Sequence, residues 1–308
     1  MLDVLRLSDV AIDIMLINCV LAYAASAALS GGAFNVAYPG FMGVGAYSAG
    51  ILSGDHGWHP IMATLAGIAV ALLAALLLQV LLRRLDGVYL AVASVGFVVL
   101  IGALGRNLTS ITGGAIGLHG FRAQLSREEL VLLVAVIAFG FFVFGRSRLA
   151  SLVAIRREDP ELASALGLKV DRMGTILVMV SAGLGALGGS VRAYWLGGVS
   201  PGDYVFTLVL TLMAMVVVGG VGHWSGPLIG AAIFTALPEW TRDLGTWRDI
   251  GIGAIVLVIV RFAPGGIAGT FQALWARRRM RTMARAEGRG GGVGAPLKPL
   301  AAATQEAS

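Results

Sequence analysis

Charged residues are scarce in this sequence. Only 13% of its 308 residues are Asp, Glu, Lys or Arg, whereas 57% are hydrophobic. A soluble domain of this length carries about 25% charged residues, because its surface has to be hydrated. The composition therefore excludes a soluble globular protein and indicates an integral membrane protein.

Cysteine is nearly absent, and the features of a cleaved leader are missing. The single cysteine, Cys19, lies in the first apolar segment and has no second cysteine with which to form an intramolecular disulfide. The first residues do not combine a basic stretch, a short apolar run and a small-residue cleavage site. We therefore exclude redox chemistry and expect the first apolar segment to remain in the mature protein.

Motifs that bind nucleotides or metals are also missing. No G-x-x-x-x-G-K-S/T sequence is present, so the chain lacks a Walker-type site for ATP hydrolysis of its own. His56 and His59 have a metal-like spacing, but Gly57 and Trp58 between them favour a solvated turn. We expect no metal, no cofactor and no catalytic residue, and therefore not an enzyme.

Long apolar runs fill most of the chain. A helix needs about 20 apolar residues to cross a bilayer, and we predict nine such spans. They are residues 10–30, 33–53, 61–82, 88–106, 130–145, 173–196, 204–222, 226–240 and 250–262. The predicted fold is all-α, a polytopic transmembrane helical bundle of about 8–10 spans. It occupies residues 1–270, and residues 271–308 are expected to form a disordered, basic, cytoplasmic tail. Glycine and proline in residues 33–53 predict a broken or closely packed helix there.

Arginines in the loops indicate which side faces the cytoplasm. Cations concentrate around residues 83–84, 146–172 and 261–281, and the positive-inside rule places these regions in the cytoplasm. The net charge of +6 thus reflects membrane topology, and we expect no nucleic-acid partner. With nine spans the C-terminus is cytoplasmic and the N-terminus outside. If residues 33–53 are re-entrant instead, the N-terminus moves inside.

Charge is also missing from the middle of every predicted span. Asp13, Arg192 and Glu239 lie near span ends, where a side chain reaches the membrane interface. Ion-coupled transporters usually need carboxylates or a polar ion site at membrane depth. This absence argues against an ion-coupled secondary transporter, but it leaves open an ion site built from backbone carbonyls.

One charged segment, residues 154–172, interrupts the apolar sequence and predicts a short cytoplasmic helix. Asp159 is a suitable N-cap, Pro160 a first helical residue, and Gly167 a left-handed stop. A helix of about two turns is marginal alone, so it needs packing through Leu162, Leu166 and the small residues between them. These residues alone leave open an ordinary loop helix.

Seven segments together resemble the permease subunits of branched-chain amino-acid ABC importers, LivM-like with LivH-like relatives. They are GFMGVGAY (40–47), RLDGVYLAVASVGF (84–97), LTSITGGAIGL (108–118), AIRREDPELASALGLKV (154–170), SAGLGALGGSV (181–191), VVVGGVGHWSGPLIGAA (216–232) and RFAPGGI (261–267). The resemblance implies a multi-pass permease of the bacterial inner membrane that imports branched-chain or other amino acids. The implied partners are a second, LivH-like permease subunit, two cytoplasmic ABC ATPases that bind the ATP, and a periplasmic substrate-binding protein.

The resemblance also assigns a role to the short helix, as the coupling helix that docks on the ATPase. The residues concerned are Glu158, Asp159, Pro160, Glu161, Leu162, Ala163, Ser164, Ala165, Leu166 and Gly167. The glutamate that is usual in the coupling helix of this family is missing from residues 162–167. Tyr38 replaces a usual histidine, and Ala115-Ile116 replaces a usual Pro-Asn, so substrate preference can differ from leucine, isoleucine and valine.

The substrate pathway is expected to be mostly apolar, with few polar contacts. The candidates for those contacts are Asn35, Tyr38, Asn107, Thr109 and Thr112. Each of them is equally compatible with helix packing or a loop. An alternative function is a stand-alone facilitator or channel for a small polar solute such as urea or an amide, which needs neither a coupling helix nor partners.

Overall fold

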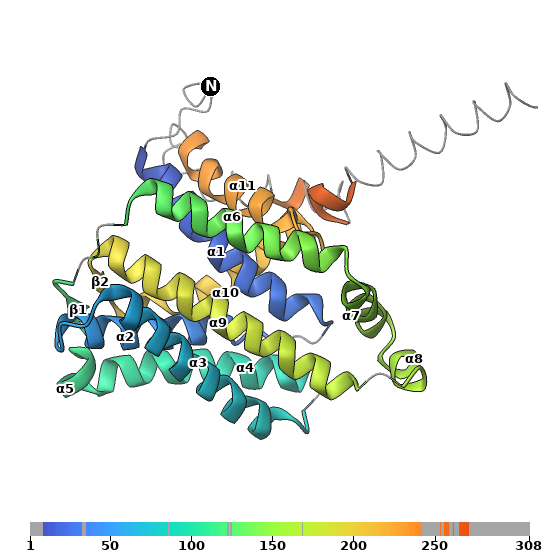
Figure 1. Cartoon of the computed structure of the whole chain (residues 1–308), viewed down its shortest axis with the longest axis horizontal. Helices are drawn as coiled ribbons and strands as arrows, with labels where there is room; N and C mark the ends of the chain where they lie inside the picture. Colours follow the sequence, from blue (N-terminus) through green and yellow to red (C-terminus); the bar gives the residue numbers. More distant parts are fainter. Residues whose placement is uncertain are drawn as a thin grey trace, which may run out of the picture. The chain divides into compact units, whose positions relative to one another are not determined.

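The apolar runs become helices over nearly all of the described chain (Figure 1). The computed structural model describes residues 9–241 without 33, 34, 86, 122, 124 and 168, and in addition residues 253, 256–258, 261 and 265–270. The helices are α1 (Asp9–Ser30), α2 (Tyr38–Gly54), α3 (Pro60–Leu82), α4 (Gly87–Asn107), α5 (Thr109–Thr112), α6 (Arg127–Gly145), α7 (Arg148–Glu158), α8 (Pro160–Ala165), α9 (Val170–Leu196), α10 (Phe206–Gly219) and α11 (Gly226–Trp240).

Six stretches are long and apolar enough to cross a membrane within the part of the chain that the structure describes. They are α1, α3, α4, α6, α9 and the stretch Pro201–Gly219, which consists of η2 (Pro201–Asp203) and α10 with the residues between them. The shorter helices α2 and α11, of 17 and 15 residues, coincide with two more predicted spans. The ninth predicted span, residues 250–262, lies largely outside the described residues. The all-α, polytopic bundle is confirmed.

Helix α2 runs from one end of the bundle to the other. Gly31 and Gly32, just before it, lie against Arg156 and Arg157 of α7, at the end of the bundle where α9 begins. Gly50, near the end of α2, lies against the ring of Phe121. That ring contacts Tyr194 in the last turn of α9, with ring centroids 6.0 Å apart. Residues 38–54 form one continuous helix along the bundle, which favours a complete span over the re-entrant alternative.

Helix α9 packs against α1, α2 and α3, and glycines allow the close approach. A Cβ at Gly45 would overlap the backbone of Ala186, and one at Gly189 would overlap the backbone of Met42. Between them, the Ser190 hydroxyl donates a hydrogen bond to the Gly45 carbonyl at 3.1 Å. The close packing predicted for residues 33–53 is confirmed, because glycine removes the side chain that would hold the two backbones apart.

A small sheet, absent from the all-α prediction, links two loops at the end of the bundle remote from α8. Strand β1 (Leu118–His119) pairs antiparallel with β2 (Gly198–Val199), in the register Leu118 with Val199. Gly117, with φ +80°, lets the chain approach the Val199 carbonyl closely. A 3-10 turn, η2 (Pro201–Asp203), follows β2. The sheet fixes the loop after α5 to the end of α9.

Candidate functional site

The short helix in the charged segment forms as the sequence predicts, although it is shorter. Helix α8 has six residues, about 1.7 turns at 3.6 residues per turn. The Asp159 carboxylate caps it by accepting hydrogen bonds from the backbone N–H groups of Glu161 at 3.0 Å and Leu162 at 2.9 Å. Gly167 follows with φ +78°, the left-handed conformation that glycine adopts without strain. The cap and the stop are both confirmed.

Helix α8 presents its large apolar side chains to the outside. Ala163 is fully buried, whereas Leu162 is 51% exposed and Leu166 is 61% exposed. The Ser164 hydroxyl donates to the Glu161 carbonyl of the same helix, and Ala165 is exposed. Within the described chain, Ala163 is thus the one buried side chain of α8. Both leucines remain exposed and available to another protein.

Two arginines of α7 fasten this segment to the ends of three spanning helices. The Arg156 guanidinium donates to the Gly31 carbonyl after α1 and, at 3.1 Å, to the Val170 carbonyl at the start of α9. Arg157 donates to the Val221 carbonyl after α10 at 3.4 Å. Burial lowers the pKa of Arg156, and the nearby Asp171 carboxylate opposes that effect. Helix α7 therefore acts as a bracket between α8 and the bundle (Figure 1).

Glycines make room for the two arginines. A Cβ at Gly174 would lie 2.6 Å from an Arg156 nitrogen, and a Cβ at Gly222 would lie 2.8 Å from an Arg157 nitrogen. Gly32, with φ +75°, lies against the Arg157 backbone. Sequence reasoning missed this bracket. The available signal was the pair of arginines directly before the capped helix.

Two of the predicted pathway residues use their polar atoms within the chain. The Asn35 side-chain oxygen accepts a hydrogen bond from the Ala37 N–H at 3.0 Å, which fixes the turn before α2. The Tyr38 hydroxyl donates to the Val209 carbonyl at 3.0 Å. Both residues are buried. Asn35 also lines a cavity of about 540 Å³ that Arg156 and Asp171 share.

The other three lie together around the end of α4. Asn107 donates to the Ala103 carbonyl of its own helix at 2.8 Å. The buried Thr112 hydroxyl contacts the Gly105 and Leu108 carbonyls, at 2.8 Å each, and Thr109 is exposed.

The five candidates form two separate groups along α4. The first group lies at Ser94 of α4, whose hydroxyl accepts a hydrogen bond from the backbone N–H of Val36, the residue after Asn35. From there to Asn107 the helix rises about 20 Å at 1.5 Å per residue. The structure therefore does not bring the five candidates to one place.

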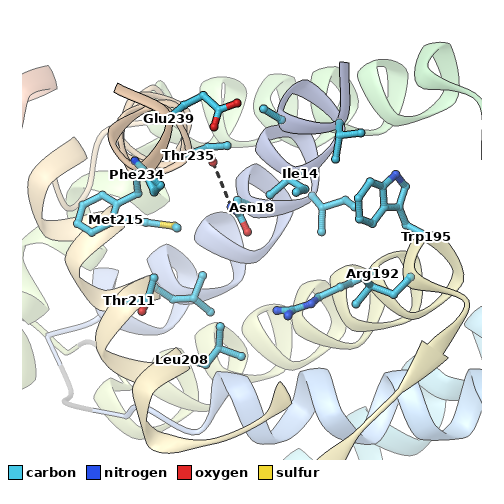
Figure 2. Close-up of a pocket in the computed structure, with 16 residues that line it drawn as sticks. Ile14, Asn18, Arg192, Trp195, Leu208, Thr211, Met215, Phe234, Thr235 and Glu239 are labelled. Carbon is cyan, nitrogen blue, oxygen red and sulfur yellow. Dashed lines mark hydrogen bonds between the residues drawn. The ribbon is translucent and has the colours of Figure 1, made fainter. Parts of the chain in front are cut away.

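A cavity that sequence reasoning missed lies between α1, α9, α10 and α11 (Figure 2). Its volume is about 540 Å³, and its wall is mostly apolar. The Asn18 amide of α1 donates a hydrogen bond of 3.1 Å to the Thr235 hydroxyl of α11 in its wall, and Arg192 and Glu239 also line it. No sequence motif marks the cavity, because each helix contributes only one face.

Comparison with known proteins identifies the chain's relatives. A family model described as the permease component of branched-chain amino acid transport systems matches residues 10–260. The chain belongs to this family. The high-affinity branched-chain amino acid transport system permease protein LivM of Salmonella typhimurium is 27% identical over 75% of this chain and 62% of its own length. LivM of Escherichia coli is 26% identical over the same shares.

A second type of relative is the permease protein LivH of the same kind of system. LivH of Salmonella typhimurium is 25% identical over 49% of this chain and 50% of its own length. No solved structure matches the chain. The chain thus spans less than two thirds of the LivM proteins that it matches. The resemblance to LivM-like and LivH-like permeases is confirmed, as is a multi-pass membrane protein.

Proposed function

We propose that this chain is a permease subunit of an ATP-driven importer for branched-chain or other amino acids in the bacterial inner membrane. The observation that carries the proposal is α8, a capped helix with two exposed leucines, fastened by α7 to the ends of α1, α9 and α10. Family membership and the names of the LivM and LivH relatives support the substrate class.

The proposed assembly has four further subunits of three types. A second, LivH-like permease completes the membrane pathway, two cytoplasmic ABC ATPases bind and hydrolyse ATP, and a periplasmic protein delivers the substrate. This chain then needs no cofactor and no catalytic residue of its own. The lipid bilayer surrounds the spanning helices.

The coupling mechanism follows from the bracket. The exposed Leu162 and Leu166 insert into a groove of the ATPase, so that closure of the ATPases displaces α8. Arg156 carries the displacement to the end of α1 and the start of α9, because its guanidinium bonds to both. Helix α9 packs against α1, α2 and α3. A shift at one end is therefore transmitted through a closely packed core that deforms little.

The orientation of the bundle follows from the positive-inside rule. The end with α7 and α8 carries Arg83, Arg84 and Lys169 as well as the bracket, so we assign it to the cytoplasm. Helix α1 begins at the opposite end, which puts residue 9 outside. We assign the C-terminal tail, residues 271–308, to the cytoplasm. These residues are not among those that the structure describes.

Affinity purification from native membranes tests the proposal. We expect the tagged chain to recover an ATPase and a second permease, and a variant without residues 159–167 to lose the ATPase alone. A finer variant, Leu162→Asp with Leu166→Asp, leaves the Asp159 cap intact and should also lose the ATPase. Ile116→Asp is the matched control, because Ile116 is 79% exposed and lies in the loop before β1, away from α8.

Recovery of the chain alone from gently solubilised membranes would contradict the importer and favour a stand-alone facilitator or channel. Family membership favours the importer, because the relatives are named as components of transport systems. An ion-coupled transporter is distinguished by uptake that collapses with the ion gradient in cells that retain ATP.

A further inference from the structure

The cavity between α1, α9, α10 and α11 is built from one face of each helix. Its residues on α1 and α10 repeat every three or four positions, as in Ile14 and Asn18 or Leu208 and Thr211. The ends of α9 and α11 contribute Arg192 and Glu239. Figure 2 shows these side chains around a common space. A cavity of about 540 Å³ is within the usual range of small-molecule sites, about 300–1,000 Å³.

The charged groups of the cavity come from different walls. Figure 2 shows the Arg192 guanidinium on the α9 wall and the Glu239 carboxylate on the α11 wall, with Asn18 between them. Asn18 donates one amide hydrogen to the Thr235 hydroxyl at 3.1 Å, which leaves its carbonyl oxygen as an acceptor.

Arg192 forms an ion pair with Asp203 at 3.6 Å through one guanidinium nitrogen, a distance longer than a hydrogen bond. Its remaining N–H donors can bind a further anion. The other oxygen of Asp203 already accepts the Ser200 N–H at 2.9 Å in the η2 turn. A guanidinium has five N–H donors in a plane, and two of them fit a carboxylate in parallel. The arrangement suits a free carboxylate that enters the cavity.

The rest of the wall suits an aliphatic group. Ile14, Leu208, Met215 and Phe234 line the cavity, and its surface is mostly apolar. An apolar wall stabilises a bound hydrocarbon side chain by removing it from water. A molecule that complements both parts carries a carboxylate, a cationic group and an aliphatic side chain.

We propose that this cavity is a binding site for a zwitterionic α-amino acid with an aliphatic side chain. Arg192 binds the substrate carboxylate, the Asn18 carbonyl oxygen accepts from the ammonium group on the side of the cavity that Glu239 lines, and the apolar wall contacts the side chain. The inference rests on the proposed function, and it places the substrate site at the end of the bundle opposite α8. Substrate released from a periplasmic protein reaches that end first.

Equilibrium binding of radiolabelled leucine tests the assignment. The tagged chain is purified from its native membrane with whatever subunits accompany it, and no binding protein is added. Wild type should bind leucine saturably and bind leucinamide, which lacks the carboxylate, much more weakly. Arg192→Gln should bind leucine about tenfold more weakly or worse, as expected for the loss of a charged hydrogen bond, and should no longer distinguish the two compounds.

Two matched variants control for charge and folding. Arg106→Gln removes an arginine at the end of α4, and Glu128→Gln removes an exposed carboxylate in the first turn of α6. Neither residue lines the cavity, so both variants should bind leucine as wild type does. Absence of saturable binding to wild type up to about 10 mM leucine would overturn the assignment, as would unchanged binding by Arg192→Gln.

Protection from alkylation gives a second measurement that needs no charged variant. Thr211→Cys places a thiol in the cavity, whereas Thr207→Cys places one a turn earlier on α10, outside its wall. The native Cys19 is 3% exposed and adds little background. Leucine at about five times its dissociation constant should slow maleimide labelling of Thr211→Cys about sixfold and leave Thr207→Cys unchanged.

Equal labelling with and without leucine would show that leucine does not occupy the cavity, and would overturn the assignment. The same purification reports separately on the importer. If an ATPase accompanies the chain but leucine gives no protection, the amino-acid site is wrong and the proposed function stands. If leucine protects the thiol and no ATPase is present, the proposed function fails and the site stands.

Discussion

At the scale of single residues, Arg156 has the largest mechanical role in this account. It is half-buried in α7, and its guanidinium bonds to backbone carbonyls at the ends of two different spanning helices. Gly31 and Gly174 leave the space that it fills. A lysine in its place presents a single point charge and cannot reproduce the planar, two-directional contact.

Replacing Arg156 should separate ATPase docking from transport. We expect Arg156→Lys and Arg156→Gln to lower the uptake rate about tenfold, because each loses a charged hydrogen bond of about 1.5–3 kcal/mol. The ATPase should still co-purify, since α8 keeps its cap. Arg148→Gln, at the exposed start of the same helix, is the control and should transport normally. Wild-type uptake by both Arg156 variants would refute the bracket.

Gly167 is a second residue where a single change is informative. Its φ of +78° is unfavourable for a β-branched residue, although nothing lies within 4 Å of an added Cβ. Gly167→Val should therefore strain only the backbone, by about 1–2 kcal/mol, and uncouple uptake from ATP hydrolysis. Asn tolerates this conformation, so Gly167→Asn should retain most of the activity. Normal uptake of labelled amino acid by Gly167→Val would count against the left-handed stop.

At the scale of elements, the contact between α2 and α9 organises the bundle. Backbone lies directly on backbone there, as at Gly45 with Ala186 and at Gly189 with Met42. Serine hydroxyls on α9 add hydrogen bonds to neighbouring helices, including Ser181 to the Ala24 carbonyl at 2.7 Å. Small residues and such hydrogen bonds replace the hydrophobic driving force, which is weak between helices inside a membrane.

A large side chain in this contact should destabilise the fold. Gly189→Leu should destabilise the fold by about 3 kcal/mol, because the helices cannot separate without losing the contacts of the whole core. Gly140→Leu on α6 is the control, since a Cβ there meets nothing within 4 Å. The readout is the Tm of the purified protein and the yield of its monodisperse form. Equal values for the two variants would contradict the close packing.

Sequence predicted these elements unevenly, for physical reasons. Hydropathy predicted the spanning helices, because a helix that crosses a bilayer needs about 20 predominantly apolar residues in a row. Strand β1 with β2 was missed because two-residue strands containing Gly198 and His119 carry no periodic signal. The cap at Asp159 was predictable from neighbouring residues alone. The contacts of Arg156 and the cavity at Arg192 were not, because they join residues distant in the sequence.

At the scale of the whole molecule, the account fixes a topology. In the proposed topology, the loop around His56 faces outside and the loop at Arg83 and Arg84 faces the cytoplasm, and α3 connects the two loops. Alkaline phosphatase fused after residue 57 should be active, and the same enzyme fused after residue 84 should be inactive. The reverse pattern would show that the bundle is inverted and that α8 cannot meet a cytoplasmic ATPase.

The central claim is that α8 docks on an ATPase, and site-specific photo-cross-linking tests it most directly. A photo-reactive residue is placed at Leu162, which is 51% exposed, and a control is placed at Ile116. In native membranes the adduct from Leu162 should contain a protein that has a Walker motif and binds ATP, identified by mass spectrometry. The adduct from Ile116 should not contain it. If Leu162 yields no ATPase while the chain remains folded in the membrane, the account is contradicted.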